Sequence, residues 1–410
     1  MRDRGPGSRP RARAAEGPVV AIACLGAAVM TAGVQGIAPA IPAIQSQFSL
    51  DAAQVALITS VYLFPSMFSA FGSGVLADRF GSRPVFAVSL LIFGVGGAFL
   101  LVEHSLAAVL IVRLVQGAAF GAVLSLSVAI IGDVASSTRA AAKGQSRRVV
   151  SISAFESILP MAGGVLVAFA WYAPFAMQLL ALPCAVAAWL VLPTGTGGRD
   201  GPAPAGTRAV LSAPAVLSVQ MLGALRFVLK FAVLTYFPVL AVSLLGMSAA
   251  QVGLVMGVSA FLTAVAAWST QRLVARWLSS QLIAGCLVTG MVSLAALGAA
   301  GLMDGDLLTV AAAALLVFGL QDGVYGVAHN VLIAELAPPG ARSSYVGLSG
   351  TVRNVGKFAA PMIFGAATVV LSIPHSFLAL AAVSLASVAS ARRVIRVEVG
   401  RRRERPVPDP

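Results

Sequence analysis

Seven charged residues lie inside long apolar runs of this sequence, and they are the residues most able to do chemistry. The cations are Arg113, Arg226, Lys230, Arg353 and Lys357, and the acids are Glu156 and Asp322. A charge at the centre of a membrane helix costs about 3 kcal/mol on insertion scales. These side chains are therefore expected to face a protein interior or a wet cavity. Because cations outnumber acids, we predict that this cavity accepts an anionic or zwitterionic solute.

The spacing of these charges places several of them on shared helix faces. Arg226 and Lys230 are four residues apart, and Arg353 and Lys357 repeat that arrangement. Residues 322, 325 and 329 also share one face, which would carry a carboxylate, a phenol and an imidazole. The alternative is that these charges form structural pairs within a bundle, and that the polar pair at 329 and 330 is simply hydrogen-bonded.

Either acid could carry a coupling proton. Burial disfavours an ionised carboxylate, and a neighbouring cation favours it. Gaining or losing such a partner would therefore move a proton onto or off Glu156 or Asp322. This is the chemistry that an ion-coupled transport cycle requires.

The elements that position these residues are long apolar segments. Of 410 residues, 58% are hydrophobic and only 10% are charged, although the formal net charge is +13. A soluble domain is about a quarter charged, so this composition excludes disorder and argues against a cytosolic enzyme. The sequence predicts an all-α membrane protein with twelve spans of about 20 residues or more. The predicted spans are 18–41, 54–77, 84–102, 107–131, 149–171, 175–193, 214–243, 251–270, 281–302, 307–335, 345–371 and 375–395. A cleaved signal peptide is the alternative for the first run.

A Gly- and Pro-rich stretch divides the chain into two similar halves. SLDAAQVALITSVYLF at 49–64 resembles GMSAAQVGLVMGVSAF at 246–261, so the two halves repeat with an offset of about half the chain length. We predict two pseudo-symmetric six-helix bundles. The predicted segments are a basic cytoplasmic tail at 1–17, a bundle at 18–193, a cytoplasmic linker at 194–213, a bundle at 214–395 and a basic cytoplasmic tail at 396–410.

The distribution of positive charge predicts the orientation. Of 28 Lys and Arg residues, five lie in spans, and all the others fall on the side that holds both termini. By the positive-inside rule that side is cytoplasmic, in a multi-pass protein of the inner (plasma) membrane. Because these cations lie in scattered loops beside the membrane, nucleic-acid binding is excluded. The two tails could contact anionic lipid headgroups, or serve only as topology anchors.

The loop after the second predicted span carries the most specific motif. GVLADRFGSRPVF, from Gly74, resembles the signature loop of the major facilitator superfamily. The matching positions are Gly74, Asp78, Arg79, Gly81 and Arg83. The resemblance covers nearly the whole chain and implies that this loop is a conformational latch. The corresponding loop of the second half keeps only its arginines.

Three further segments resemble motifs of that family, and the last two of them concern its branch. RLVQGAAFGA in the fourth span is similar to the family's Arg-x-x-x-Gly motif, which implies a role in proton coupling for Arg113; a structural arginine bonded to carbonyls is the alternative. AGVQGIAPAIP resembles the end of the first span in twelve-span drug:proton antiporters. LPMAGG resembles the antiporter motif Gly-Pro-x-x-Gly-Gly, with Leu159 in place of the first Gly. The matching Pro160, Gly163 and Gly164 are predicted to act in gating.

The resemblance also proposes which residues bind substrate. Spans 1, 4, 7 and 10 line the central cavity in this family. The predicted substrate-binding residues are Gln35, Arg226, Lys230, Asp322, His329, Arg353 and Lys357, and the predicted proton-coupling residues are Arg113, Glu156 and Asp322.

Three classes of function remain open at this stage. The first is proton-coupled efflux of a small drug, antibiotic or metabolite by alternating access, by a protein expected to be a monomer. The second is uptake of an organic anion by proton symport or facilitated diffusion. The third is a sensor or a membrane-embedded enzyme, which is disfavoured because no metal-ligand spacing, cofactor motif or paired nucleophile and base is present.

Overall fold

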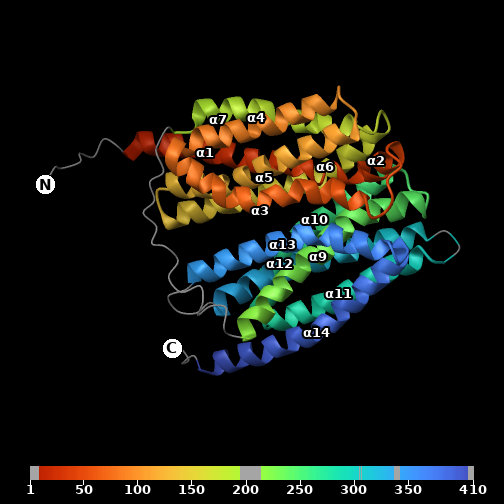
Figure 1. Ribbon diagram of the computed structural model, residues 1–410. Helices are drawn as coiled ribbons and strands as arrows, with labels where there is room; N and C mark the ends of the chain where they lie inside the picture. Colours follow the sequence, from red (N-terminus) through yellow and green to blue (C-terminus); the bar gives the residue numbers. More distant parts are fainter. Residues whose placement is uncertain (1–8, 194–213, 304, 306, 337–341, 405–410) are drawn as a thin grey trace. The chain divides into compact units, whose positions relative to one another are not determined.

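The computed structural model describes residues 9–193, 214–303, 305, 307–336 and 342–404, and every regular element in these ranges is helical (Figure 1). The first half contains α1 (Arg9–Val29), α2 (Ile41–Gln47), α3 (Val55–Phe80), α4 (Ser82–Leu100), α5 (Leu106–Val134), α6 (Thr138–Val167) and α7 (Ala181–Val191), with short 3-10 helices η2 (Met30–Gly33), η3 (Ala38–Ala40) and η4 (Ala173–Leu180). The second half contains α9 (Pro214–Ser243), α10 (Ala249–Val274), α11 (Ser279–Ala300), α12 (Leu308–Leu336), α13 (Arg342–Thr368) and α14 (Ile373–Glu404). The predicted all-α fold is confirmed.

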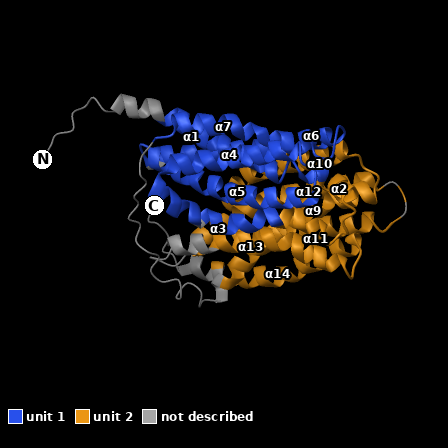
Figure 2. Ribbon diagram, turned by 45° about the horizontal axis from the view of Figure 1, so that its top comes forward, with its two compact units in different colours: residues 1–40, 61–200 blue, residues 41–60, 201–410 orange. Residues whose placement is uncertain are grey.

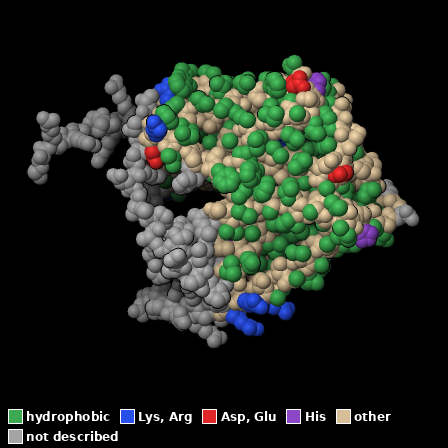
Figure 3. All heavy atoms as spheres, viewed as in Figure 1, with side chains coloured by type: hydrophobic (Ala, Val, Ile, Leu, Met, Phe, Trp, Pro, Cys, Tyr) green, Lys and Arg blue, Asp and Glu red, His purple; other side chains and the backbone are tan. Residues whose placement is uncertain are grey.

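Most predicted spans correspond to helices of membrane-crossing length. Among the described residues, ten helices are long and apolar enough to cross a membrane, and α3, which bends by 51° after Ala70, would be an eleventh. The remaining predicted span, 345–371, coincides with α13, which is outside that set and carries Arg353 and Lys357 in its middle. On the face drawn in Figure 3, hydrophobic side chains are spread over the described part and charged side chains are few, as expected for contact with lipid.

Contacts divide the chain into two compact units (Figure 2): residues 1–40 with 61–200, and residues 41–60 with 201–410. The short segment 41–60 thus groups with the second half. Its contacts explain why: the hydroxyl of Tyr236 in α9 donates to the carbonyl of Ala52 (2.9 Å), and Ser60 donates to the carbonyl of Phe358 in α13 (3.3 Å). The predicted linker 194–213 lies outside the described residues.

Glycines let the helices of the first unit approach closely. A Cβ on Gly117 of α5 would lie 1.9 Å from the carbonyl oxygen of Tyr62 in α3, and one on Gly121 would lie 2.6 Å from that of Ser66. Small residues serve this purpose in membranes, where helices associate through close packing rather than through hydrophobic burial. In this unit α4 packs on α5 and α7, and α1 packs on α6 and α5.

In the second unit, glycines of α12 likewise allow close helix packing. The Cβ of a larger residue at Gly319 or Gly323 would meet the backbone of α10 at 2.4 or 2.2 Å, and Ser259 of α10 donates to the carbonyl of Leu315 (2.9 Å). Along the other side, α11 packs on both α12 and α14.

Side-chain contacts explain two of the larger differences between predicted span boundaries and helix boundaries. Helix α14 continues beyond 395 to Glu404, and the buried carboxylate of Glu398 accepts hydrogen bonds from the backbone N–H groups of Ser279 and Ser280 at the start of α11 (3.2 and 3.0 Å). Helix α6 begins eleven residues before the predicted 149, and Arg148 on it donates to the carbonyl of Leu124 in α5 (3.0 Å).

Candidate functional site

The centre of the second unit is a carboxylate held between two cations. Asp322 of α12 forms ion pairs with Arg226 (Nε to Oδ1, 2.8 Å) and Lys230 (Nζ to Oδ2, 3.2 Å), both on α9. The Asp322 side chain is only 4% exposed. Arg226 also donates from Nη2 to the main-chain carbonyl of Asp322 (3.2 Å). These contacts hold α9 against α12 at the level of Asp322.

A phenylalanine joins this centre to the cations of α13. The Phe227 ring lies 5.0 Å from the guanidinium of Arg226 and 5.0 Å from the ammonium of Lys357. Such cation–π contacts are attractive, more so when water is excluded. Arg353, one turn earlier on α13, donates to the side-chain carbonyl of Asn330 (3.2 Å). Four cations and one carboxylate of the second unit therefore lie on α9, α12 and α13.

Two glycines allow α9 and α12 to approach closely enough for this pairing. A Cβ on Gly326 would lie 2.7 Å from Nη2 of Arg226, and one on Gly223 would lie 2.5 Å from the His329 ring. The ring nitrogen Nε2 of His329 lies 2.9 Å from the carbonyl oxygen of Val219, and the ring is almost fully buried. This environment is typical of a residue that ties two helices together, and substrate binding by His329 stays a prediction.

In the first unit, Arg113 of α5 supports a break in the first span. The helix is interrupted between η2 and η3, and Arg113 donates from Nη2 to the carbonyl of Gly33 (3.1 Å) while its guanidinium lies 5.0 Å from the Tyr62 ring. The Tyr62 hydroxyl donates to the carbonyl of Met30 (3.3 Å). Non-helical backbone at membrane depth needs such partners. The geometry matches the structural alternative for Arg113, and its role in proton coupling is a prediction.

The predicted gating glycine of α6 contacts the same break. A Cβ on Gly163 would lie 2.1 Å from the carbonyl oxygen of Gly36, so only glycine fits at this contact. Pro160 lies inside α6, and Gly164 is buried next to Gly163. Gln35, a predicted substrate ligand, is buried in the non-helical segment between η2 and η3.

Glu156 of α6 is half-buried, and its side chain makes no hydrogen bond or ion pair with any other residue that the structure describes. This contrasts with Asp322, which is held by two cations. A role for Glu156 in proton coupling stays a prediction.

The signature loop joins α3 to α4 through a left-handed glycine. Gly81 has a φ of 90°, which side chains rarely adopt, and the guanidinium of Arg83 lies 5.0 Å from the Trp189 ring of α7. Asp78 and Arg79 are exposed, and Gly74 has open space around it. Among the described residues the Asp78 side chain has no hydrogen-bond or ion-pair partner, and a latch role for this carboxylate stays a prediction.

Sequence reasoning missed Phe227, Tyr62 and Arg148. The first two are aromatic residues in apolar runs, where core packing is the ordinary reading, and only their position beside a cation distinguishes them. Arg148 precedes the predicted span 149–171 because hydropathy falls there, although the four cations at 139–148 lie on α6. Within the described ranges no cluster of three or more His, Cys, Asp or Glu residues could hold a metal ion.

Comparisons with known proteins agree with this architecture. A family model described as Major Facilitator Superfamily matches residues 23–361. The bacillibactin exporter of Bacillus subtilis (strain 168) is 27% identical over 160 residues, which cover 36% of this chain and 38% of the exporter. The multidrug efflux protein YfmO of the same strain is 28% identical over 160 residues, 38% of each chain. The match therefore spans well under half of the length of either relative. The solved structure of the nucleoside transporter NupG superimposes with a TM-score of 0.76 at 10% identity, covering 93% of this chain and 99% of that one, which is a likeness of fold.

Proposed function

The chain belongs to the major facilitator superfamily, and on that premise we propose that it exports a small drug, antibiotic or metabolite in exchange for protons, by alternating access. The family and the named relatives indicate a multi-pass membrane transporter rather than an enzyme. By their names, those relatives are an exporter of bacillibactin and a multidrug efflux protein, and they support the export direction. The substrate is proposed to be zwitterionic or anionic.

The observation that carries this proposal is the charge of the Asp322 centre. Asp322 neutralises one of two adjacent cations, and Arg353 and Lys357 on α13 add two more positive charges in the same unit. An anionic group of the substrate would meet the α13 cations, with Phe227 offering an apolar and aromatic surface between them and Arg226. Binding there replaces water around partly buried charges by a charge of opposite sign.

Exchange with protons requires that substrate and proton compete for one group. A zwitterion meets this condition, because its cationic group would pair with ionised Asp322 and a proton would displace it. A purely anionic substrate would behave differently: protonation of Asp322 would free Arg226 and Lys230 to bind the anion, so that proton and anion bind together. Glu156 and Arg113 are the proposed coupling residues of the first unit, where the carboxylate is unpaired among the described residues.

Joint binding of a proton and an anion is the physical basis of the alternative function, which is uptake of an organic anion by proton symport or facilitated diffusion. The pH dependence of binding separates the two. Under exchange, substrate affinity rises with pH because a proton no longer competes for Asp322. Under symport, affinity falls with pH because the two cations return to the carboxylate.

The first experiment is antibiotic-susceptibility and metabolite profiling of a deletion strain, which identifies a substrate. Transport of that substrate is then measured in proteoliposomes with an imposed proton gradient, for the wild type and for Lys230→Gln combined with Arg353→Gln. Loss of transport supports the anion-binding role. Exposed Arg392 of α14 provides the control, since Arg392→Gln removes one positive charge at a residue outside the Asp322 centre. Normal transport by a well-inserted double variant would refute the role of these cations.

We further propose that the protein works as a monomer in the inner (plasma) membrane with both termini in the cytoplasm. The clustering of cations on the side of the termini supports this orientation. The protein would interact there with its small-molecule substrate, with protons and with membrane lipids.

A further inference from the structure

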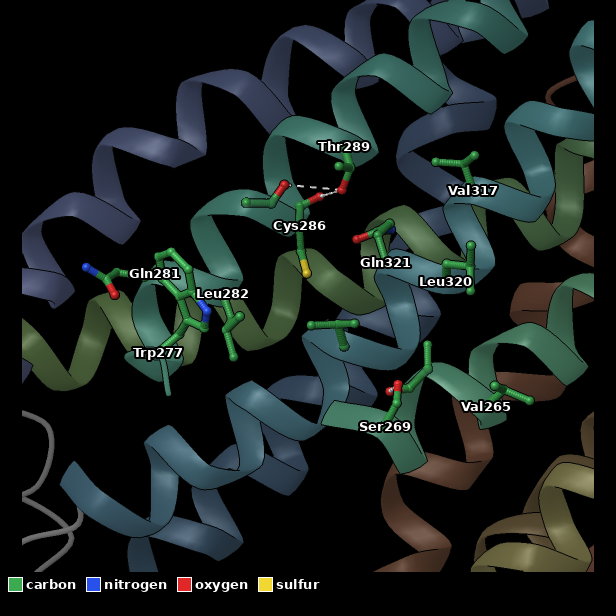
Figure 4. Close-up of a pocket in the computed structure, with 13 residues that line it drawn as sticks. Val265, Ser269, Trp277, Gln281, Leu282, Cys286, Thr289, Val317, Leu320 and Gln321 are labelled. Carbon is green, nitrogen blue, oxygen red and sulfur yellow. Dashed lines mark hydrogen bonds between the residues drawn. The ribbon is translucent and has the colours of Figure 1, made fainter. Parts of the chain in front are cut away.

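A groove of about 780 Å³ opens on the second unit between α10 and α11. Both helices pack on α12, and the face of α12 between them forms the floor of the groove. In Figure 4, Val265 and Ser269 line it from α10, Cys286 and Thr289 line it from α11, and Gln321 rises from α12. Its lining is predominantly apolar.

The groove has the length of one leaflet of a membrane. Its lining on α11 runs from Gln281 to Thr289, and Trp277 extends it beyond the start of that helix. At 1.5 Å per residue, the twelve positions from 277 to 289 correspond to about 18 Å. Half of a hydrocarbon core is about 15 Å thick. A groove of this length that begins at a membrane surface would extend to about mid-depth.

The surface end of the groove carries positive charge. Arg272 and Arg276 are exposed on the segment between Ser269 and Trp277, both of which line the groove. Arg272 lies 5.8 Å from the Trp268 ring. The sequence has no Asp or Glu from 201 to 303. One carboxylate approaches from α14, that of Glu398, but it is 1% exposed and bonded to the first N–H groups of α11.

We propose that this groove binds an anionic glycerophospholipid, with one acyl chain between α10 and α11 and the phosphate against Arg272 and Arg276. The charge decides the class of lipid, because each arginine near the surface favours anionic over neutral lipid by about fivefold. Trp277 and Trp268 lie where the amphipathic indole is usually found, at the level of the headgroups.

The bound lipid would act on the transport site through α12. The residues of α12 that form the floor, including Gln321, are adjacent along the helix to Asp322, which faces α9. An acyl chain that fills the groove therefore supports the helix that carries the central carboxylate. The proposal concerns a site distinct from the Asp322 centre, and it holds whether the protein exports or imports its substrate.

Tryptophan fluorescence provides a direct test, because Trp277 lines the groove. The protein is given Trp171→Phe, Trp189→Phe and Trp268→Phe, which leaves Trp277 as the single fluorophore. It is reconstituted into phosphatidylcholine vesicles with increasing fractions of phosphatidylglycerol or phosphatidylcholine brominated on the acyl chain. If both arginines contact the headgroup, brominated phosphatidylglycerol should reach half-maximal quenching at a lipid fraction about 30-fold lower than brominated phosphatidylcholine does. Equal quenching by the two lipids would overturn the proposal.

Variants at the two ends of the groove sharpen the test. Arg272→Gln with Arg276→Gln should bring the two lipids within about twofold of each other, whereas Arg139→Gln with Lys143→Gln, at exposed cations of α6, should keep the full preference. A preference that survives loss of Arg272 and Arg276 would contradict the assigned headgroup site.

The groove itself can be filled without a clash. Gly285 lines it and has no atom within 4 Å of an added Cβ, so Gly285→Leu should place its side chain where the acyl chain lies and reduce maximal quenching by at least half. Gly132→Leu on α5, a position with similarly open surroundings, is the matched control. Unchanged quenching in Gly285→Leu would refute the acyl-chain position.

A last variant tests the chemical class of the occupant. The Oε1 atom of Gln321 is buried and has no hydrogen-bond partner in the described part of the chain. An acyl chain does not need this amide, so Gln321→Leu should leave the preference for phosphatidylglycerol within about twofold of the wild type. Loss of that preference would instead indicate a hydrogen-bonding solute and overturn the lipid proposal.

Discussion

The pairing of Asp322 with two cations makes a quantitative prediction about the stability of the second unit. Removing one member of a buried ion pair typically costs about 3–5 kcal/mol, mainly because a charge is left without its partner. Asp322→Asn leaves Arg226 and Lys230 behind. Their side chains are 16% and 23% exposed, so water can partly rehydrate them. We expect a loss near the lower limit, about 3 kcal/mol.

The reverse change should cost more. Arg226→Gln with Lys230→Gln leaves the carboxylate, whose side chain is 4% exposed, without either cation. We expect a loss near the upper limit, about 5 kcal/mol. The triple variant removes all three charges, so no unpaired charge remains. Its stability should therefore return to within about 2 kcal/mol of the wild type.

The three cysteines of the chain supply the assay. Cys24, Cys184 and Cys286 are all free and buried, so a thiol-reactive fluorogenic dye reports unfolding in detergent as each thiol becomes accessible. Unfolding is followed as a function of temperature and of denaturant for the wild type and the three variants. Arg392→Gln, at an exposed arginine of α14, is the control for loss of one positive charge.

Comparison of the variants tests whether Asp322, Arg226 and Lys230 interact, because the comparison does not depend on absolute stabilities. If the losses of Asp322→Asn and of the double cation variant simply add in the triple variant, the three groups do not interact and the assigned geometry is refuted. A triple variant more stable than either parent confirms the coupling.

Three further predictions follow from single contacts. Arg113→Met leaves the Gly33 carbonyl without its donor and should lower the free energy of unfolding by about 1–3 kcal/mol in the thiol-dye assay. The control, Arg139→Met at an exposed arginine, should lower it by almost nothing. Equal melting curves for these two variants would show that Arg113 does not support the helix break. Gly163→Ala places a Cβ 2.1 Å from the Gly36 oxygen, so it should destabilise the first unit by about 1–3 kcal/mol and reduce transport. The control, Gly132→Ala, should change neither stability nor transport. A fully active and stable Gly163→Ala variant would show that the close contact between Gly163 and Gly36 is not needed. Tyr236→Phe removes the hydrogen bond to Ala52, which contributes about 1 kcal/mol, and should increase amide hydrogen exchange in residues 48–60 about fivefold. The control, Tyr325→Phe, loses a hydrogen bond to Leu222 and should leave exchange in residues 48–60 unchanged. Unchanged exchange in Tyr236→Phe would mean that other contacts hold this segment.

Hydropathy located nearly all the helices because each span must satisfy its own backbone and face lipid, and both demands are local. It failed where tertiary contacts override composition. Four cations precede residue 149, yet α6 includes them, since Arg148 finds carbonyl and hydroxyl partners on α5. Likewise the basic stretch after 395 continues α14, where Glu398 binds the start of α11.

The shared faces of the charged residues were also predictable, because helical periodicity fixes them. Arg226 and Lys230 do lie together, and both meet Asp322. The role of Phe227 was not predictable, since a phenylalanine in an apolar run carries no signal until Lys357 on another helix is placed beside it.

The sequence by itself determined the membrane class, the family and the set of residues that could bind charge, because hydropathy, motifs and intramembrane charges are properties of the chain alone. Only the tertiary structure decided which partner each charge has. Arg113 donates to the carbonyl of Gly33 in the broken first helix, and segment 41–60 joins the second unit. The absence of a side chain at Gly326 leaves room for Arg226 beside Asp322. These choices depend on how closely and in which register helices pack, and that is set by contacts between residues far apart in the sequence.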